Sequence, residues 1–167
     1  MSFHILPYHP EAAVAYAHEW AFRRNPKYGD FEDLGGDCTN FISQALLAGG
    51  AVMNETRDVG WFYHSMDSRA AAWTSAAHLY RFLVTNRGRG PFGREIAIDE
   101  VRPGDVIQLK FAGHDDFSHS LLVVSAGDPP APRNILVAAH SYDCDDRPLN
   151  TYSYVTARAI RIDGVRR

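Results

Sequence analysis

Cys38 is the residue whose position in the sequence best suits it for covalent chemistry. Gly35-Gly36 interrupt the preceding chain, Asp37 is a good helix N-cap, and the helix predicted after it ends at Gly49-Gly50. Cys38 therefore lies in a first helical turn, where backbone N–H groups lack partners and the macrodipole is positive. This position favours a thiolate, so we expect a depressed pKa for Cys38. The same N–H groups could hold an oxyanion.

A lone cysteine can also be a small buried hydrophobe, and this is the competing interpretation of Cys38. The residues of the predicted helix that form its apolar stripe are Phe41, Ile42, Ala45 and Leu46. Cys38 lies outside this stripe, at the polar start of the helix. Its position therefore favours the nucleophile.

A cysteine nucleophile needs a base, usually histidine, and a third group that orients the base. Among the eight histidines, His119 lies between Ser118 and Ser120 and leads into an apolar strand. His140 closes a second apolar strand that begins at Ile135. If these strands are antiparallel neighbours, both histidines could face one site.

The elements that must position these residues divide the chain into two parts. Helices are predicted over residues 10–24, from Cys38, and from Thr74 or Ser75 to the break at Arg87-Gly88-Arg89-Gly90-Pro91. Four strands follow, over residues 106–111, 117–125, 135–140 and 152–162, joined by loops at 113–116, 127–133 and 141–150. Helices followed by strands predict an α+β domain with an antiparallel sheet, formed by residues 1–167 as a single unit.

Composition excludes several classes of protein. The formal net charge of -3 argues against a nucleic-acid binder that relies on positive charge. No apolar run is long enough to span a membrane, and residues 1–10 lack the pattern of a signal peptide, so the default expectation is a cytoplasmic protein. Cys38 and Cys144 are too few for a disulfide framework or a four-cysteine zinc site, although they could pair with each other.

The ordered set of motifs resembles the bacterial "putative amidase domain" family, within the papain-like group of NlpC-type cell-wall peptidases and CHAP amidases. The resemblance is carried by the segment Gly36-Asp37-Cys38-Thr39-Asn40-Phe41-Ile42-Ser43-Gln44-Ala45-Leu46 with Gly49-Gly50, and by further motifs in the family's order. These are Ala13–Ala17, Asn25-Pro26, Trp61, Trp73-Thr74, Pro103-Gly104-Asp105-Val106, Ser118-His119-Ser120 and His140-Ser141. The implied fold is papain-like, with the cysteine at a helix N-terminus packed on the sheet.

The resemblance implies Cys38 as nucleophile, His119 as general base and acid, and His140 as the orienting residue. Asp143 is the alternative for the third role, because Asp145 and Asp146 beside it are typical of a solvated turn. Tyr28, Asp37 and Trp61 are candidates for contacts with the oxyanion or the substrate. Tyr28 matches an upstream tyrosine of NlpC-type enzymes, and Trp61 belongs to an aromatic-rich segment that could wall a cleft.

The implied reaction is hydrolysis of an amide or peptide bond through a thioester, with a cell-wall peptide as a possible substrate and with no metal or organic cofactor. Three alternatives remain open: an acyltransferase with the same machinery, a non-catalytic binding domain, and a zinc site built from Cys38, His119 and His140 or Asp143. The oligomeric state is not determined by the sequence. Cys144, which lies among aspartates, is expected to react slowly.

Overall fold

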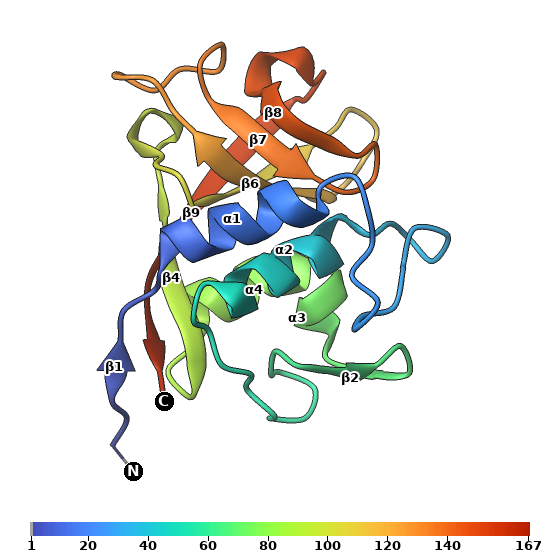
Figure 1. Ribbon diagram of the computed structural model, residues 1–167, viewed down its shortest axis with the longest axis vertical. Helices are drawn as coiled ribbons and strands as arrows, with labels where there is room; N and C mark the ends of the chain where they lie inside the picture. The colour runs from blue at the N-terminus through green and yellow to red at the C-terminus, as the bar shows by residue number, and fades with distance from the viewer. Residues whose placement is uncertain (1) are drawn as a thin grey trace.

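The computed structural model describes residues 2–167, in which helices pack on an antiparallel sheet (Figure 1). The α-helices are α1 (Pro10–Trp20), α2 (Cys38–Ala48), α3 (Ala71–Thr74) and α4 (Ala76–Thr85). Two short 3-10 helices, η1 and η2, span Ile98–Glu100 and Leu149–Thr151. The α+β class expected from the sequence is confirmed.

The main sheet has seven strands in the order β1-β9-β5-β6-β7-β8, and β4 pairs with β9 outside this path. Its strands are β1 (Ile5–Leu6), β4 (Gly90–Ile96), β5 (Val106–Lys110), β6 (His119–Ser125), β7 (Leu136–Ala139), β8 (Cys144–Pro148) and β9 (Thr156–Arg166). A separate hairpin joins β2 (Tyr63–Ser65) to β3 (Ser68–Arg69). All the pairings are antiparallel.

Strand β6 is buried on both faces, and its alternate residues belong to different cores. Leu122 and Val124 pack in the core shared with helices α1, α2 and α4. Leu121 and Val123 belong to a second core, on the opposite face of the sheet. Successive strand residues point to opposite faces, so His119 points to the same face as Leu121 and Val123.

Helix α2 is buried almost all round, beyond the apolar stripe that the sequence predicts. Its polar residues Thr39, Asn40, Ser43 and Gln44 are also buried, and each has a hydrogen-bond partner. The chain enters the helix through Gly35 and Gly36, whose φ angles of 98° and 103° suit glycine. At the other end, the Gly49 N–H donates to the carbonyl of Ala45 at 2.9 Å.

Several boundaries differ from those expected. Helix α1 ends at Trp20 rather than at residue 24, and β9 begins at Thr156 rather than at residue 152. Strand β4 was not expected, because Gly90-Pro91 is typical of a chain break. The strand pairs with β9 alone. Such an edge strand tolerates proline. The predicted loop over residues 141–150 contains β8. Ser75, one of the two predicted caps, caps α4 by accepting from the His78 N–H at 3.4 Å.

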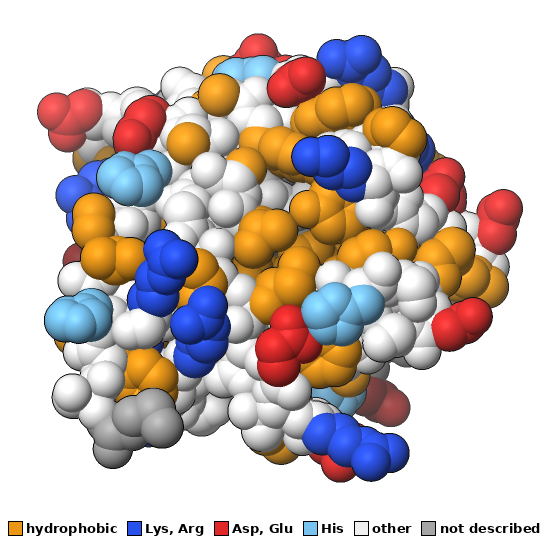
Figure 2. Space-filling model, turned by 60° about the horizontal axis from the view of Figure 1, so that its bottom comes forward, with side chains coloured by type: hydrophobic (Ala, Val, Ile, Leu, Met, Phe, Trp, Pro, Cys, Tyr) orange, Lys and Arg blue, Asp and Glu red, His pale blue; other side chains and the backbone are white. Residues whose placement is uncertain are grey.

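The face of the molecule turned forward in Figure 2 has apolar side chains grouped near its middle, with both signs of charge and histidines around them. This face therefore offers no broad surface of one charge. In the described part of the chain, none of the helices is long and apolar enough to cross a bilayer.

Candidate active site

Cys38 is the first residue of α2, where that helix meets the start of β6. The residue is 7% exposed, and its Sγ lies 3.8 Å from the Ser118 carbonyl oxygen and 3.8 Å from Thr39 Oγ1. The side chain of Asp37 forms no capping bond with the helix. Within residues 2–167 the N–H groups of Cys38 and Asn40 have no hydrogen-bond acceptor, whereas the Thr39 N–H bonds the Cys38 thiol. Two donors of the first turn are therefore available to an oxyanion.

Asp37 occupies the N-cap position, but its buried carboxylate points back into the protein. It accepts hydrogen bonds from the Phe31 N–H at 2.8 Å and from Asn40 Nδ2 at 2.9 Å, and it lies 2.5 Å from His140 Nδ1. Burial alone would raise the pKa of Asp37, but these hydrogen bonds and the charge of His140 hold it below its usual range. Asp37 is therefore an ionised anchor for the turn before Cys38, and it makes no contact suited to an oxyanion.

His140 is held by this anchor and does not reach His119. Its Nδ1 lies 2.5 Å from Asp37 Oδ2, its Nε2 lies 2.8 Å from the Trp20 carbonyl oxygen, and its ring stacks on Phe41 at 4.0 Å between centroids. Both ring nitrogens of His140 therefore lie at hydrogen-bond distance from oxygen atoms of other residues. The expected hydrogen bond from His119 to His140 is therefore not formed, because His140 has no free ring nitrogen.

Asp143, the alternative third residue, forms an ion pair with Arg24 at 2.9 Å. Arg24 also lies 3.5 Å from Asp37, 3.4 Å from Glu32 and 3.4 Å from Asp30. Asp143 thus belongs to the group of carboxylates around Arg24, next to the turn that precedes Cys38. It makes no hydrogen bond to His119. Arg24 was not predicted as part of the site, because its contact with Asp143 joins segments that are far apart in the sequence.

The backbone on either side of His119 contacts the Cys38 thiol, whereas the His119 ring lies in a neighbouring pocket. The Ser118 carbonyl contacts Sγ, and the backbone of Ser120 also bonds the thiol. Ser120 Oγ lies 2.9 Å from Thr39 Oγ1, on the helix side of the sheet, so His119 points to the other face. There its ring packs 5.7 Å from Tyr152 and 6.2 Å from Phe111, with no hydrogen bond to Cys38.

The ionisation of both groups differs from that of a preformed ion pair. Burial, followed by the charge of Arg147, lowers the pKa of His119 to about 4, so its imidazole is neutral at pH 7. Burial raises the pKa of the Cys38 thiol, with a smaller contribution from the charge of Asp37, and outweighs the hydrogen bonds from Ser120 and Thr39. The expectation of a depressed thiol pKa is therefore wrong, because desolvation exceeds the effect of the helix N-terminus.

The pocket that contains the His119 ring has a volume of about 380 Å³. It is lined by Phe111, Ser118, His119, Ser141, Tyr142, Arg147 and Tyr152. Ser141 also accepts a hydrogen bond from the Asp37 N–H at 3.0 Å, which ties the pocket wall to the turn before Cys38. Arg147 lies inside the predicted loop over residues 141–150 and Tyr152 begins the strand predicted at 152–162, so neither was singled out as a site residue.

Trp61 and Tyr28 have different surroundings. Trp61 is fully buried, donates from Nε1 to Ser43 Oγ at 3.0 Å and packs on Trp73, so it is a core residue and cannot wall a substrate cleft. Tyr28 is half-buried against Trp73, and burial raises its pKa. The carbonyl of the next residue, Gly29, accepts from Asn40 Nδ2 at 2.9 Å, which places the Tyr28 segment beside the start of α2.

Both cysteines are free thiols. Cys144 Sγ lies 3.3 Å from Tyr152 Oη, at the back of the pocket. Within residues 2–167, one group of side chains, His18, Asp145 and Asp146, is close enough to share a metal ion, and all three are at least partly exposed. The zinc alternative proposed from the sequence involves none of these residues.

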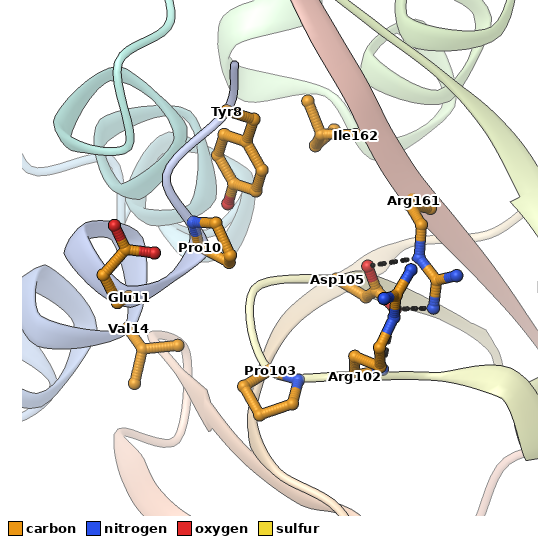
Figure 3. Close-up of a pocket in the computed structure, with 9 residues that line it drawn as sticks. All are labelled: Tyr8, Pro10, Glu11, Val14, Arg102, Pro103, Asp105, Arg161 and Ile162. Atoms are coloured by element: carbon orange, nitrogen blue, oxygen red, sulfur yellow. Dashed lines mark hydrogen bonds and ion pairs between the residues drawn. The ribbon is translucent and has the colours of Figure 1, made fainter.

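A larger pocket of about 590 Å³ lies elsewhere, between the start of α1, the turn before β5 and strand β9 (Figure 3). Its buried carboxylate, Asp105, is engaged by Arg161 at 2.9 Å and by the Arg102 N–H at 2.8 Å. At its edge, Tyr8 Oη donates to the Gly104 carbonyl at 3.0 Å. This pocket contains neither a thiol nor a histidine, so its size does not make it the candidate active site. The Pro103-Gly104-Asp105 motif therefore has a structural role.

The helical N-terminal half and the antiparallel sheet define an α+β domain, with the Cys38 thiol at the start of a helix. Residues 7–162 match the model of the family described as "Putative amidase domain", and the chain belongs to this family. It is 38% identical over 133 residues to "Uncharacterized protein YhbB" of Bacillus subtilis (strain 168). The alignment covers 78% of this chain and 40% of that relative. No solved structure matches the chain.

Proposed function

We propose that this chain is a cysteine-dependent amidohydrolase in which Cys38 attacks an amide carbonyl. The observation that carries the proposal is the position of the thiol, in the first turn of α2 beside the unpaired N–H groups of Cys38 and Asn40. A thiol and an oxyanion site in one helical turn are what acyl transfer requires. The family description supports the amide as the bond that is cleaved.

His119 is the proposed base, because its ring is unpartnered and its neighbours on both sides contact the thiol. The ring must turn toward Sγ when substrate binds, as catalytic hydrogen bonds often tighten only in the complex. His140 and Asp143 do not orient it. Instead, the Asp37–His140 pair and Arg24 position the turn that carries Cys38.

The reaction starts from a neutral thiol and a neutral imidazole. As the Cys38 Sγ–C bond forms, the thiol proton moves to His119, and the carbonyl oxygen becomes an oxyanion held by the first-turn N–H groups. Collapse of this intermediate breaks the C–N bond, and His119 returns the proton to the leaving amine. Water then attacks the thioester with His119 as base, which releases a carboxylic acid and restores the thiol.

The test is amine release from a panel of amides and peptides that includes cell-wall peptides. We expect Cys38→Ala to abolish hydrolysis of every substrate that the chain cleaves. Cys144→Ala, which removes the other free thiol, is the matched control and should retain most of the rate. Full hydrolysis by Cys38→Ala would refute the proposal.

A further inference from the structure

Arg147 is a fixed cation that has no acidic partner. Its Nε donates to Thr151 Oγ1 at 2.7 Å and its Nη2 donates to the Thr151 carbonyl at 3.2 Å. Its guanidinium carbon lies 3.6 Å from the centre of the Tyr152 ring. Among the described residues, no carboxylate lies within ion-pair distance of Arg147, so its positive charge is not neutralised.

Two of the three aspartates that precede Arg147 pair with other residues, and the third, Asp146, forms no ion pair with Arg147. Asp143 pairs with Arg24 at 2.9 Å, and Asp145 pairs with His18 at 2.7 Å. Arg147 therefore lines the pocket beside His119 as an unpaired charge, and its effect on His119 is that of a nearby cation. A charge held in place without a partner is suited to an anionic ligand.

The guanidinium keeps one planar edge free. Thr151 uses the edge formed by Nε and Nη2, and within residues 2–167 Nη1 donates no hydrogen bond to a protein acceptor. The Nη1–Nη2 edge presents two parallel N–H donors, the geometry that binds a carboxylate in a bidentate manner. The aromatic rings of Phe111, Tyr142 and Tyr152 form apolar walls around it.

We infer that the substrate of the Cys38 site carries a carboxylate close to the scissile amide, and that Arg147 binds this carboxylate within the pocket lined by Phe111, Tyr142 and Tyr152. The inference rests on the proposed function, since it takes Cys38 as the group that reacts. Tyr142 is 90% exposed at the rim of the pocket, where its ring can cover the substrate. Arg147 is thus a specificity-determining residue for acidic amides.

Alkylation of Cys38 by matched reagents tests the inference without a known substrate. The probes are N-bromoacetylglycine and N-bromoacetylglycinamide, which differ only in the charge of the terminal group. A second pair, iodoacetate and iodoacetamide, has a shorter reach. The measurement is the ratio of the rate for the anionic reagent to the rate for its neutral partner, for Cys38 in the Cys144→Ala background.

We expect Arg147→Gln to lower this ratio about tenfold for at least one pair, because a hydrogen-bonded charge pair is lost. Arg147→Lys should give an intermediate ratio. Arg133→Gln removes an exposed positive charge from a different loop and should leave the ratio unchanged. Thermal unfolding checks that each variant is folded, and the ratio cancels any change in the intrinsic reactivity of the thiol that both reagents of a pair share.

If Arg147→Gln left both ratios equal to those of the parent, the carboxylate inference would be wrong while the nucleophile could stand. If the neutral reagents failed to modify Cys38 in the folded protein even at alkaline pH, the proposed function itself would fail. The two failures are therefore distinguishable. A fall in the ratio that Arg133→Gln reproduced would assign the effect to net charge and also overturn the inference.

Discussion

At the scale of single residues, Cys38 and His119 are both uncharged at neutral pH. Burial raises the pKa of the thiol and lowers the pKa of the imidazole, so desolvation opposes both members of a thiolate–imidazolium pair. The helix N-terminus and the hydrogen bonds from Ser120 and Thr39 do not overcome it. Nucleophilic attack in this site is therefore coupled to proton transfer.

The rate of Cys38 alkylation by iodoacetamide should increase with pH and reach its midpoint above about 8.5, the ordinary value for a thiol. The reason is that the pKa of the buried thiol is raised, so that little thiolate exists at neutral pH. The measurement uses the Cys144→Ala protein, in which Cys38 is the remaining cysteine. A midpoint well below 8.5 would show that the ion pair is preformed after all.

The imidazole of His119 should titrate with a midpoint of about 4. Because this pKa is lowered, the ring gains its proton only as the pH falls through 4, and it stays neutral and able to accept a proton at pH 5–8. NMR of the imidazole protons measures this directly. Arg147→Gln should raise the midpoint, since it removes a nearby cation, while Arg133→Gln should not. A midpoint at or above the usual value of about 6.5 would contradict the assignment of burial as the cause.

At the scale of elements, the start of α2 is fixed by parts of the chain far away in the sequence. Asp37 binds His140, which follows β7, and the Asp37 N–H donates to Ser141 Oγ at 3.0 Å. Arg24, beyond the end of α1, completes the arrangement at 3.5 Å from Asp37. The helix and the sheet are thereby joined at the point where Cys38 meets β6.

Replacement of Asp37 by Ala should lower the free energy of unfolding by about 3–5 kcal/mol, because it leaves the buried His140 ring without its hydrogen-bond partner and removes the acceptor of the Phe31 N–H. Asp33→Ala, an exposed aspartate of the same segment, is the control and should change stability by no more than about 0.5 kcal/mol. Urea unfolding measures both values. Equal stability of the two variants would mean that the Asp37–His140 pair does not anchor the turn.

Gly36→Ala should cost about 1–2 kcal/mol, since its φ of 103° is unfavourable for alanine. An alanine Cβ would also lie 3.2 Å from Ser141 Oγ, so the turn before Cys38 must shift and alkylation of Cys38 should change in rate. Gly113→Ala has a similar strain, with a φ of 82°, but its Cβ would meet nothing within 4 Å. Comparable losses of stability, with an altered alkylation rate only for Gly36→Ala, would support this account. Unaltered alkylation of Gly36→Ala would contradict it.

At the scale of the whole molecule, the sequence predicts the order of the elements better than the facing of the site residues. The α+β class, the helix at Cys38 and the strands at 106, 119 and 136 follow from local patterns. The direction of the His119 ring does not follow from the sequence. Strand β6 is apolar on both faces, so the alternation of its residues does not indicate which face packs against the helices. The partner of His140 is 103 residues away, so its role depends on the tertiary fold.

In the proposed reaction an acyl group is transferred to Cys38, and trapping of that acyl-enzyme is the decisive experiment. The protein is mixed with an amide that it cleaves, quenched in acid within the first turnovers, and analysed by intact-protein and peptide mass spectrometry. The account predicts an added mass equal to the acyl part of the substrate, located on the peptide that contains Cys38 and absent from Cys38→Ala. Steady amine release with no adduct on Cys38, together with undiminished hydrolysis by Cys38→Ala, would contradict it.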